Sequence, residues 1–425
     1  MSTKSVGDPP SLPPPPPPPQ AISPKDRKML ALIRNSAPVL LQNIQSGLSR
    51  LPVELVWAAH SQWPLQPEES RAQQPNNRPI RISILDSSFN PPTLAHLALA
   101  NSARPKYHSE PPGSEYDAKL LLLSVKNADK TLKPGDASYH QRLEMMALLA
   151  KEVRTHYHRQ GGDNHNLAIA IVDEPTFVGK SRVLQEYLRN RLATLLPETQ
   201  SHPCNANVNV GADASTKTIP INQRPQLTFI VGMDTLERLF SPRYYPPSPP
   251  SDPTTTTAAA GGVTAEQTMI TVLSRMLSPY PEGDDTLIVC AKRGNLPSDK
   301  TQDSKGESGY ASTLKLGIKC GWMKDPDTSA HSTSGSGSVV PPDPRHPDSD
   351  VASPTEDDGN IPNNERIVII NIGDRESKFS STAVRNARAR MGLVGSEVGG
   401  GPWKQWVTKS VAQYIEEEKL YVSSV

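Results

Sequence analysis

The sequence predicts an α/β fold, a Rossmann-like, doubly wound parallel sheet with helices on both faces and long disordered insertions. Short runs rich in Val, Ile and Leu recur along the chain, and helical patterns separate several of them. The runs are nearly continuous in apolar residues rather than alternating, which is typical of strands buried on both faces. Strands that alternate with helices in this way form parallel sheets covered by helices.

The predicted elements follow one another in a regular order. Strands are predicted at residues 80–85, 119–125, 167–172, 227–231, 287–291 and 367–372. Apolar residues at helical spacing predict helices at residues 141–153, 181–196, 382–391 and 403–419. A further helix is predicted ahead of the sheet, from residue 24 to about residue 49.

The composition limits how much of the 425-residue chain can bury a core, since 44 residues are proline and 35% are hydrophobic. We predict a disordered proline-rich tail at residues 1–25 and a single α/β domain at residues 26–425. Low-complexity insertions are predicted within this domain at about 197–225, 241–283 and 294–364. Long surface loops of this kind cost a fold little free energy.

The tail contains an unbroken proline run that begins at Pro13 and ends at Pro19. Such a run is a candidate polyproline II ligand for an SH3- or WW-type partner. A solvated tail without a partner explains the same composition.

Charge and cysteine content exclude several classes of function. The net charge of +1 does not indicate binding to nucleic acid or to a membrane surface, and no apolar run is long enough to span a membrane. The N-terminus lacks the hydrophobic segment of a secretory signal. The three cysteines show no CxxC spacing, so we expect no disulfide framework and no zinc site, and we name no protein metal ligand. Cytoplasm or nucleus is the expected location.

The junction after the first predicted strand carries a polar segment. It reads Ser87-Ser88-Phe89-Asn90-Pro91-Pro92-Thr93-Leu94-Ala95-His96 and leads into a helical stretch. A strand that turns into a helix presents free N–H groups and the positive end of the helix dipole, which together favour an anion. His96 stands one turn into that helix, where it can contact a phosphate. Taken alone, His96 is better explained as a helix histidine packed against the sheet.

A second segment, Ser380-Ser381-Thr382-Ala383-Val384-Arg385, follows the last predicted strand and also opens a helix. Hydroxyls at a helix start can cap the backbone and donate to phosphate oxygens. The guanidinium of Arg385 can hold phosphate oxygens through its fork of donors. An ordinary capped helix with a surface arginine is the alternative for this segment alone.

The two segments together resemble the nucleotidylyltransferase superfamily, and most of all its eukaryotic, fungal-type nicotinamide mononucleotide adenylyltransferases. The family motifs read GSFxPxHxGH or GSFxPxTxGH, then ISSTxxR, in this order, with Phe379 here in place of the isoleucine. Gly232 and Asp234 resemble the family's GxDxL segment after the fourth strand. Arg293 resembles an arginine that follows the next strand.

The resemblance implies adenylyl transfer from ATP to nicotinamide mononucleotide or nicotinic acid mononucleotide, with Mg²⁺ accompanying the ATP. It assigns His96 and Thr93 to catalysis at the α-phosphate. It assigns nucleotide binding to Ser87, Ser88, Phe89, Asn90, Gly232, Asp234 and Arg293, and binding of the leaving phosphates to Ser380, Ser381, Thr382 and Arg385.

The sequence departs from the family in two places. Ser87 stands where the family has glycine. The segments that hold the acceptor in the family are not visible here: Lys130 and Lys133 are both candidates for a phosphate contact, and Phe177 either stacks on a base or belongs to the core.

Other functions therefore stay open. One is a different nucleotidylyltransferase, of the cytidylyl or pantetheine-phosphate type. Another is an ATP-binding, weakly hydrolysing regulatory protein without transferase activity. A dinucleotide-binding dehydrogenase is disfavoured, because no GxGxxG follows the first predicted strand.

Overall fold

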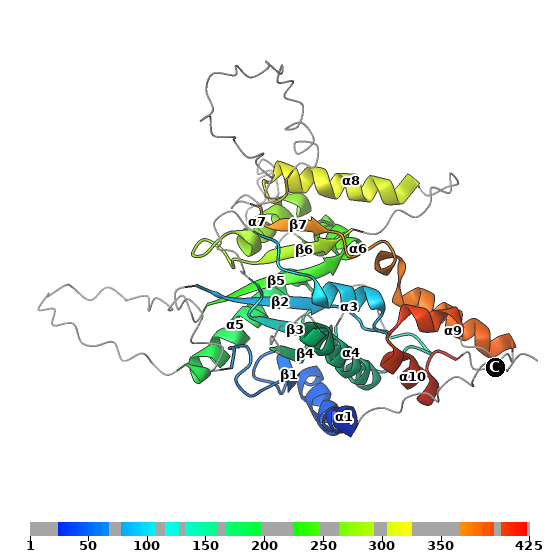
Figure 1. Ribbon diagram of the computed structural model, residues 1–425. Helices are drawn as coiled ribbons and strands as arrows, with labels where there is room; N and C mark the ends of the chain where they lie inside the picture. Colours follow the sequence, from blue (N-terminus) through cyan, green and yellow to red (C-terminus); the bar gives the residue numbers. More distant parts are fainter. Residues whose placement is uncertain are drawn as a thin grey trace, which may run out of the picture.

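A seven-stranded sheet in the order β1-β4-β3-β2-β5-β6-β7 forms the centre of the computed structural model (Figure 1). The structure describes residues 24–67, 78–106, 115–126, 132–159, 166–196, 224–246, 263–292, 304–324, 365–394 and 401–422. The predicted strands are confirmed as β2 (Ile80–Asp86), β3 (Ala118–Ser124), β4 (Leu167–Val172), β5 (Pro225–Gly232), β6 (Leu287–Ala291) and β7 (Ile367–Ile370). All neighbours among these six are parallel.

The first strand, β1 (Val53–Ala58), was not predicted from the sequence. It pairs antiparallel with β4 at the edge of the sheet. Only Val53 is fully buried in this strand. An edge strand that is only half-buried beyond its first residue lacks the continuous apolar run that marks the central strands.

Helices cover both faces of the sheet, as predicted. Alternate side chains of one strand enter two separate cores: Leu121 and Leu123 face one core, while Leu120 and Leu122 face the other. The first core is closed by α1 (Pro24–Gln45), α3 (Leu94–Asn101), α4 (Tyr139–Arg159), α9 (Ser381–Val394) and α10 (Lys409–Glu417). The second is closed by α5 (Phe177–Leu195), α6 (Met233–Leu239), α7 (Ala265–Leu277) and α8 (Ser304–Lys319).

Two helices lie within intervals that composition assigned to insertions. Helix α7 falls in the interval 241–283, where Thr264 and Gln267 form a capping box at its start. Its side chains Met269 and Leu273 are fully buried in the second core. Helix α8 falls in the interval 294–364. Low overall complexity in these intervals concealed short amphipathic helices. The proline run at residues 13–19 lies outside the described residues.

The predicted final helix at 403–419 is wrong as one piece. The structure has a 3-10 turn, Pro402–Trp406, and then α10. Val407 between them is extended, and the Thr408 hydroxyl accepts from the Val411 N–H to start the second helix. A threonine cap inside an apolar pattern was the missed signal.

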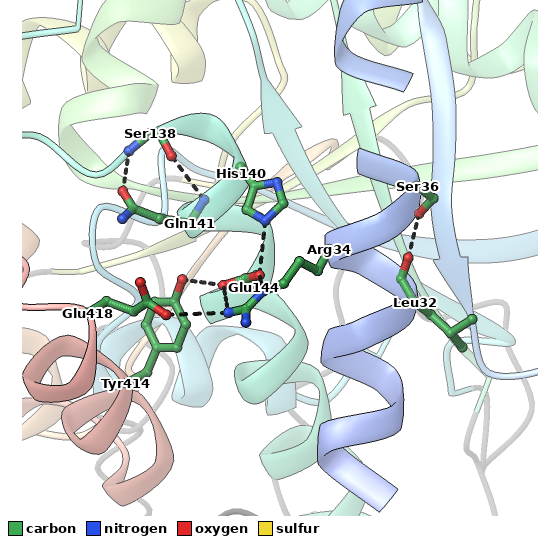
Figure 2. Close-up of polar contacts among 9 residues, drawn as sticks. All are labelled: Leu32, Arg34, Ser36, Ser138, His140, Gln141, Glu144, Tyr414 and Glu418. Carbon is green, nitrogen blue, oxygen red and sulfur yellow. Dashed lines mark hydrogen bonds and ion pairs between the residues drawn. The ribbon is translucent and has the colours of Figure 1, made fainter. Parts of the chain in front are cut away.

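A buried carboxylate joins the N-terminal helix to the rest of the fold (Figure 2). Glu144 of α4 is 1% exposed and accepts from Arg34 of α1, with Nε at 2.5 Å and Nη2 at 3.0 Å. The Tyr414 hydroxyl of α10 also donates to it, and His140 Nε2 lies 3.0 Å away. Burial raises the pKa of Glu144, but these partners outweigh burial and lower it. The cluster therefore couples α1, α4 and α10.

Within the part of the chain that the structure describes, no helix is long and apolar enough to cross a membrane.

Candidate active site at the carboxyl edge of the sheet

The site lies where the chain order of the strands reverses. From β2 the chain passes to β3 on one side, while β5 flanks β2 on the other. Ligands of open α/β sheets bind at the carboxyl ends of the strands at such a point. Leu85 pairs with Ile230, which puts Ser87 and Gly232, each two residues further on, at the same edge. The two predicted nucleotide-binding segments therefore start side by side.

The loop after β2 is held by a buried aromatic ring. The Phe89 side chain is fully buried in the first core, and its ring centroid lies 5.5 Å from that of His96. Its backbone has a φ of 44°, a left-handed conformation that side chains other than glycine rarely adopt. Burial of the ring offsets this strain, so Phe89 shapes the loop from within the core.

His96 has a defined tautomer. The Thr93 backbone N–H, which can only donate, lies 3.0 Å from His96 Nδ1. Nδ1 is therefore the acceptor, and the ring hydrogen is on Nε2. Nε2 lies 2.9 Å from Ser87 Oγ, so His96 donates a hydrogen bond to Ser87. Desolvation by burial lowers the pKa of His96 to about 4, and the ring is neutral near pH 7.

Thr93 contacts His96 and caps its helix. It is fully buried, it is the N-cap residue of α3, and its hydroxyl lies 2.9 Å from His96 Nδ1. The resemblance implied that the Thr93 hydroxyl orients a phosphate directly. In the structure the Thr93 hydroxyl contacts His96, and its contact with a phosphate stays a prediction.

Asn90 ties the loop to two distant parts of the chain. Its Nδ2 donates to Asp136 Oδ1 at 2.8 Å, just before α4. Its Oδ1 accepts from the Tyr421 hydroxyl at 2.9 Å and from the Ala137 N–H at 3.3 Å. Because both the nitrogen and the oxygen of the amide are hydrogen-bonded, Asn90 holds the loop in place. Asp136 was not predicted from the sequence, and its place just before a helix was the signal available.

The second motif packs directly on the first. Ser381 Oγ donates to the Pro91 carbonyl at 2.8 Å, and Arg385 Nη1 donates to the Asn90 carbonyl at 2.5 Å. Ser380 Oγ caps α9 by accepting from the Ala383 N–H at 3.1 Å. The two segments to which the resemblance assigned the ATP phosphates are therefore in contact in the structure.

Thr382 follows this cap on the outer side of α9. It is exposed, and its hydroxyl accepts from Arg385 Nη2 at 3.3 Å. Arg385 is thus held both by its own helix and by the loop after β2.

The charges at this junction favour an anion. Asp136 faces two arginines, with Arg385 Nε at 3.5 Å and Arg142 Nη2 at 3.8 Å. Burial raises the pKa of Asp136, but the Lys133 N–H, Asn90 and the arginines outweigh it, so the pKa is lowered. One carboxylate beside two guanidiniums leaves a net positive charge near the N-terminal ends of α3 and α9. These helix ends also carry partial positive charge from the helix dipole.

The remaining predicted residues are placed as follows. Gly232 is the N-cap of α6, and a Cβ there would meet nothing within 4 Å, so the space beside it is open. Asp234 is exposed in the first turn of α6. Ser88 is half-buried in the loop, and Lys133 is exposed. Lys130 and Arg293 lie outside the described residues.

Phe177 belongs to the second core. Its ring makes an edge contact with Phe229, with centroids 5.5 Å apart at 78°. Phe89 packs in the first core, on the other face of the sheet. Of the two predicted roles for Phe177, the structure shows the packing contact.

A buried ion pair at the same edge was not predicted. Lys180 of α5 lies 2.5 Å from Asp86, the last residue of β2, and both side chains are 6% exposed. The second Asp86 oxygen accepts from Ser124 at 3.1 Å. The acidic Asp86 at the end of a buried strand indicated that a partner was needed. The sequence did not indicate which one, because Lys180 follows a different strand, β4.

No family model matches the chain. The chain is 30% identical over 164 residues to a protein of Schizosaccharomyces pombe described as "Putative nicotinamide mononucleotide adenylyltransferase". The match covers 39% of this chain and 44% of the relative, so it spans less than half the length of that curated protein. This relative confirms the resemblance to nucleotidylyltransferases that the two motifs predicted.

Two solved structures of nicotinic acid mononucleotide adenylyltransferase from Plasmodium falciparum also align with the chain. One is a complex with NaAD, with a TM-score of 0.34, and covers 80% of this chain and 97% of that one. The other is a complex with APC, with a TM-score of 0.35, and covers 80% and 96%. Both are 11% identical to this chain.

Proposed function

We propose that this chain transfers the adenylyl group of ATP to nicotinamide mononucleotide or nicotinic acid mononucleotide, giving NAD or its acid form and pyrophosphate. The observation that carries the proposal is the packing of the second motif on the first. Ser381 and Arg385 contact the backbone of the very loop that orients His96. Two independent anion-binding helix starts therefore meet at the end of the central strand, which suits a triphosphate.

In the proposed reaction, a phosphate oxygen of the mononucleotide attacks the α-phosphorus of ATP. A new P–O bond forms, the bond from the α-phosphorus to the α,β-bridging oxygen breaks, and pyrophosphate leaves with that electron pair. No covalent enzyme intermediate is needed. The protein contributes positioning and charge stabilisation, which dominate phosphoryl-transfer catalysis.

The residues have distinct parts in this scheme. Arg385 and the start of α9 would hold the β- and γ-phosphates that become the leaving group. The neutral His96, whose Nε2–H is directed at the Ser87 hydroxyl, would help the loop after β2 to stabilise negative charge on the α-phosphate. It would not act as an acid, because a ring with a pKa of about 4 does not carry the second, acidic proton near pH 7.

Mg²⁺ enters as part of the MgATP substrate. In the described ranges there is no group of three or more His, Cys, Asp or Glu side chains that could hold a metal ion. The phosphate oxygens and water would therefore supply most of its ligands, as Mg²⁺ commonly accepts.

Mass spectrometry of the reaction products tests the proposal. The protein is incubated with MgATP and, in parallel, with nicotinamide mononucleotide, nicotinic acid mononucleotide, phosphopantetheine or no acceptor, and CTP replaces ATP in one further arm. We expect a dinucleotide and pyrophosphate with at least one pyridine mononucleotide. A product from phosphopantetheine or CTP alone would assign another transferase, and ADP without any transfer product would assign an ATP-hydrolysing protein.

His96→Ala is the matched variant for this assay. Loss of the oriented His96 ring from this loop is expected to slow turnover by about 10²-fold or more. An unchanged rate would separate the activity from this site.

A further inference from the structure

His96 does not direct its ring hydrogen into open space. The Thr93 N–H fixes Nδ1 as an acceptor, so the hydrogen is on Nε2, and Ser87 Oγ receives it at 2.9 Å. We propose that Ser87, and not His96, makes the hydrogen bond to the reacting α-phosphate, with His96 acting through the Ser87 hydroxyl. This inference rests on the proposed function and names the donor within it.

The direction of the hydrogen bonds leaves one hydrogen free. Ser87 Oγ accepts from His96 with a lone pair, so its own O–H hydrogen points elsewhere. Among the described residues, His96 is the partner that the structure gives to this hydroxyl. The O–H is therefore available to a ligand.

Ser87 also stands at the right place. It is the first residue after β2, it is half-buried, and it lies at the same edge as Gly232, beside which the space is open. Its backbone N–H is already used, donating to the Leu122 carbonyl at 3.3 Å. Of the two donors of Ser87, only the side-chain hydroxyl is therefore left to contact an anion.

The arrangement suits a developing negative charge. A hydroxyl that accepts one hydrogen bond becomes a stronger donor, because hydrogen bonds in a chain polarise one another. No proton moves: His96 keeps the hydrogen on Nε2, and Ser87 keeps its hydroxyl hydrogen. In this scheme Ser87 contacts the substrate, and His96 is a positioning residue.

A double-mutant cycle on kcat tests the chain of donors. Ser87→Ala is expected to lower kcat about 10²-fold, as removal of one transition-state donor does. The affinity for ATP should change little, because the bond strengthens as charge builds. His96→Ala should lower kcat by a similar factor. The double variant should lower kcat no more than either single variant, because both changes disrupt the same His96–Ser87 donor chain.

Two further variants exclude a structural explanation. Ser87→Thr keeps a hydroxyl and should recover most of the turnover that Ser87→Ala loses. Ser102→Ala removes a hydroxyl that donates to the Leu99 carbonyl at the far end of α3, and it should leave kcat unchanged. Losses from Ser87→Ala and His96→Ala that multiply would mean independent contacts and would overturn the proposal. Unchanged or raised turnover in Ser87→Ala would mean that the hydroxyl merely occupies His96 until phosphate displaces it.

A spectroscopic measurement separates this inference from the proposed function. The ring nitrogens of His96 are followed by ¹⁵N NMR, assigned with His96→Ala, with and without a non-hydrolysable ATP analogue. The proposal predicts that loss of the hydroxyl in Ser87→Ala changes the Nε2 signal much more than binding of the analogue to the wild type does. A large analogue-induced shift in the wild type would show direct contact and overturn it. If the predicted Nε2 signals are observed but no dinucleotide is formed, the proposed adenylyl transfer is rejected and the contact between Ser87 and phosphate is not. Absence of analogue binding would reject both.

Discussion

Arg385 donates a hydrogen bond of 2.5 Å to the carbonyl of Asn90, a residue 295 positions earlier in the chain. The same guanidinium lies 3.5 Å from Asp136 and 3.3 Å from the Thr382 hydroxyl. Its planar fork of five donors can serve these fixed partners and still offer hydrogens to a phosphate. The arginine thus belongs to the wall of the site before any ligand arrives.

Arg385→Lys is expected to weaken ATP binding about tenfold and to lower the free energy of unfolding by about 1 kcal/mol. A lysine keeps the charge but cannot hold the Asn90 carbonyl and a phosphate in one plane. Calorimetric titration with MgATP and urea unfolding measure the two effects. Arg390→Lys, an exposed position on the same helix, is the control. Equal affinity in the two variants would remove Arg385 from the binding site.

Stability should fall as the pH is lowered from about 6.5 to about 4, because His96 is neutral in the folded protein. Its pKa is lowered from 6.5 to about 4, so between these values the unfolded chain binds a proton that the folded protein does not. The stabilisation is present above the unfolded pKa and is lost as the pH falls towards the folded value. The full shift corresponds to about 3 kcal/mol.

Urea unfolding at pH 7 and pH 4.5 checks this dependence. His96→Asn keeps an acceptor for the Thr93 N–H but cannot titrate, so it should lose less stability over this interval than the wild type. Parallel pH curves for the two proteins would contradict a His96 that stays neutral in the folded protein.

Arg34→Met is expected to cost about 2 kcal/mol of unfolding free energy. It leaves the carboxylate of Glu144 buried with fewer partners, although Tyr414 and His140 remain. The value is set below the 3–5 kcal/mol typical of a broken buried pair, because Arg34 itself is 54% exposed. Arg27→Met, at an exposed position of the same helix, should change stability by less than about 0.5 kcal/mol. A loss of the same size in both variants would refute the role of the cluster.

Lys180→Met should be more destabilising than removal of the whole ion pair. The single change strands the Asp86 carboxylate in a nearly dry site and is expected to cost about 3 kcal/mol. Asp86→Asn combined with Lys180→Met removes both charges and should cost about 1 kcal/mol. Thermal and urea unfolding of the three proteins measure the difference.

Lys126→Met is the control for this pair. Lys126 forms an ion pair of 2.7 Å with Asp173 but is 66% exposed, so its loss should cost less than about 1 kcal/mol. If the double variant were as unstable as Lys180→Met, the stranded charge would not be the cause.

The sequence predicted the central strands for a physical reason, because parallel strands such as β4 are buried on both faces and show continuous apolar runs. The resemblance to a known family, and not a physical pattern, implied that the two motifs belong to one site. The edge strand β1 carries no such run. Helix α7 buries four side chains inside a low-complexity interval, where only the capping box marked it.

The partners of the site residues could not be predicted in the same way. Asp136, Tyr421 and Lys180 act through contacts with Asn90 and Asp86, which come from chain segments far away in sequence. Pattern and spacing report which face of an element is buried. They do not report which distant hydroxyl or ammonium group completes a buried amide or carboxylate.

The bond between the Tyr421 hydroxyl and Asn90 has a consequence for the order of synthesis. During translation the loop after β2 leaves the ribosome more than three hundred residues before Tyr421 does. Until then Asn90 lacks one of its hydrogen bonds, and the carbonyls of Asn90 and Pro91 await Arg385 and Ser381. While the 331 residues from Asn90 to Tyr421 are synthesised, the nascent chain therefore carries the loop after β2 without its full set of hydrogen bonds.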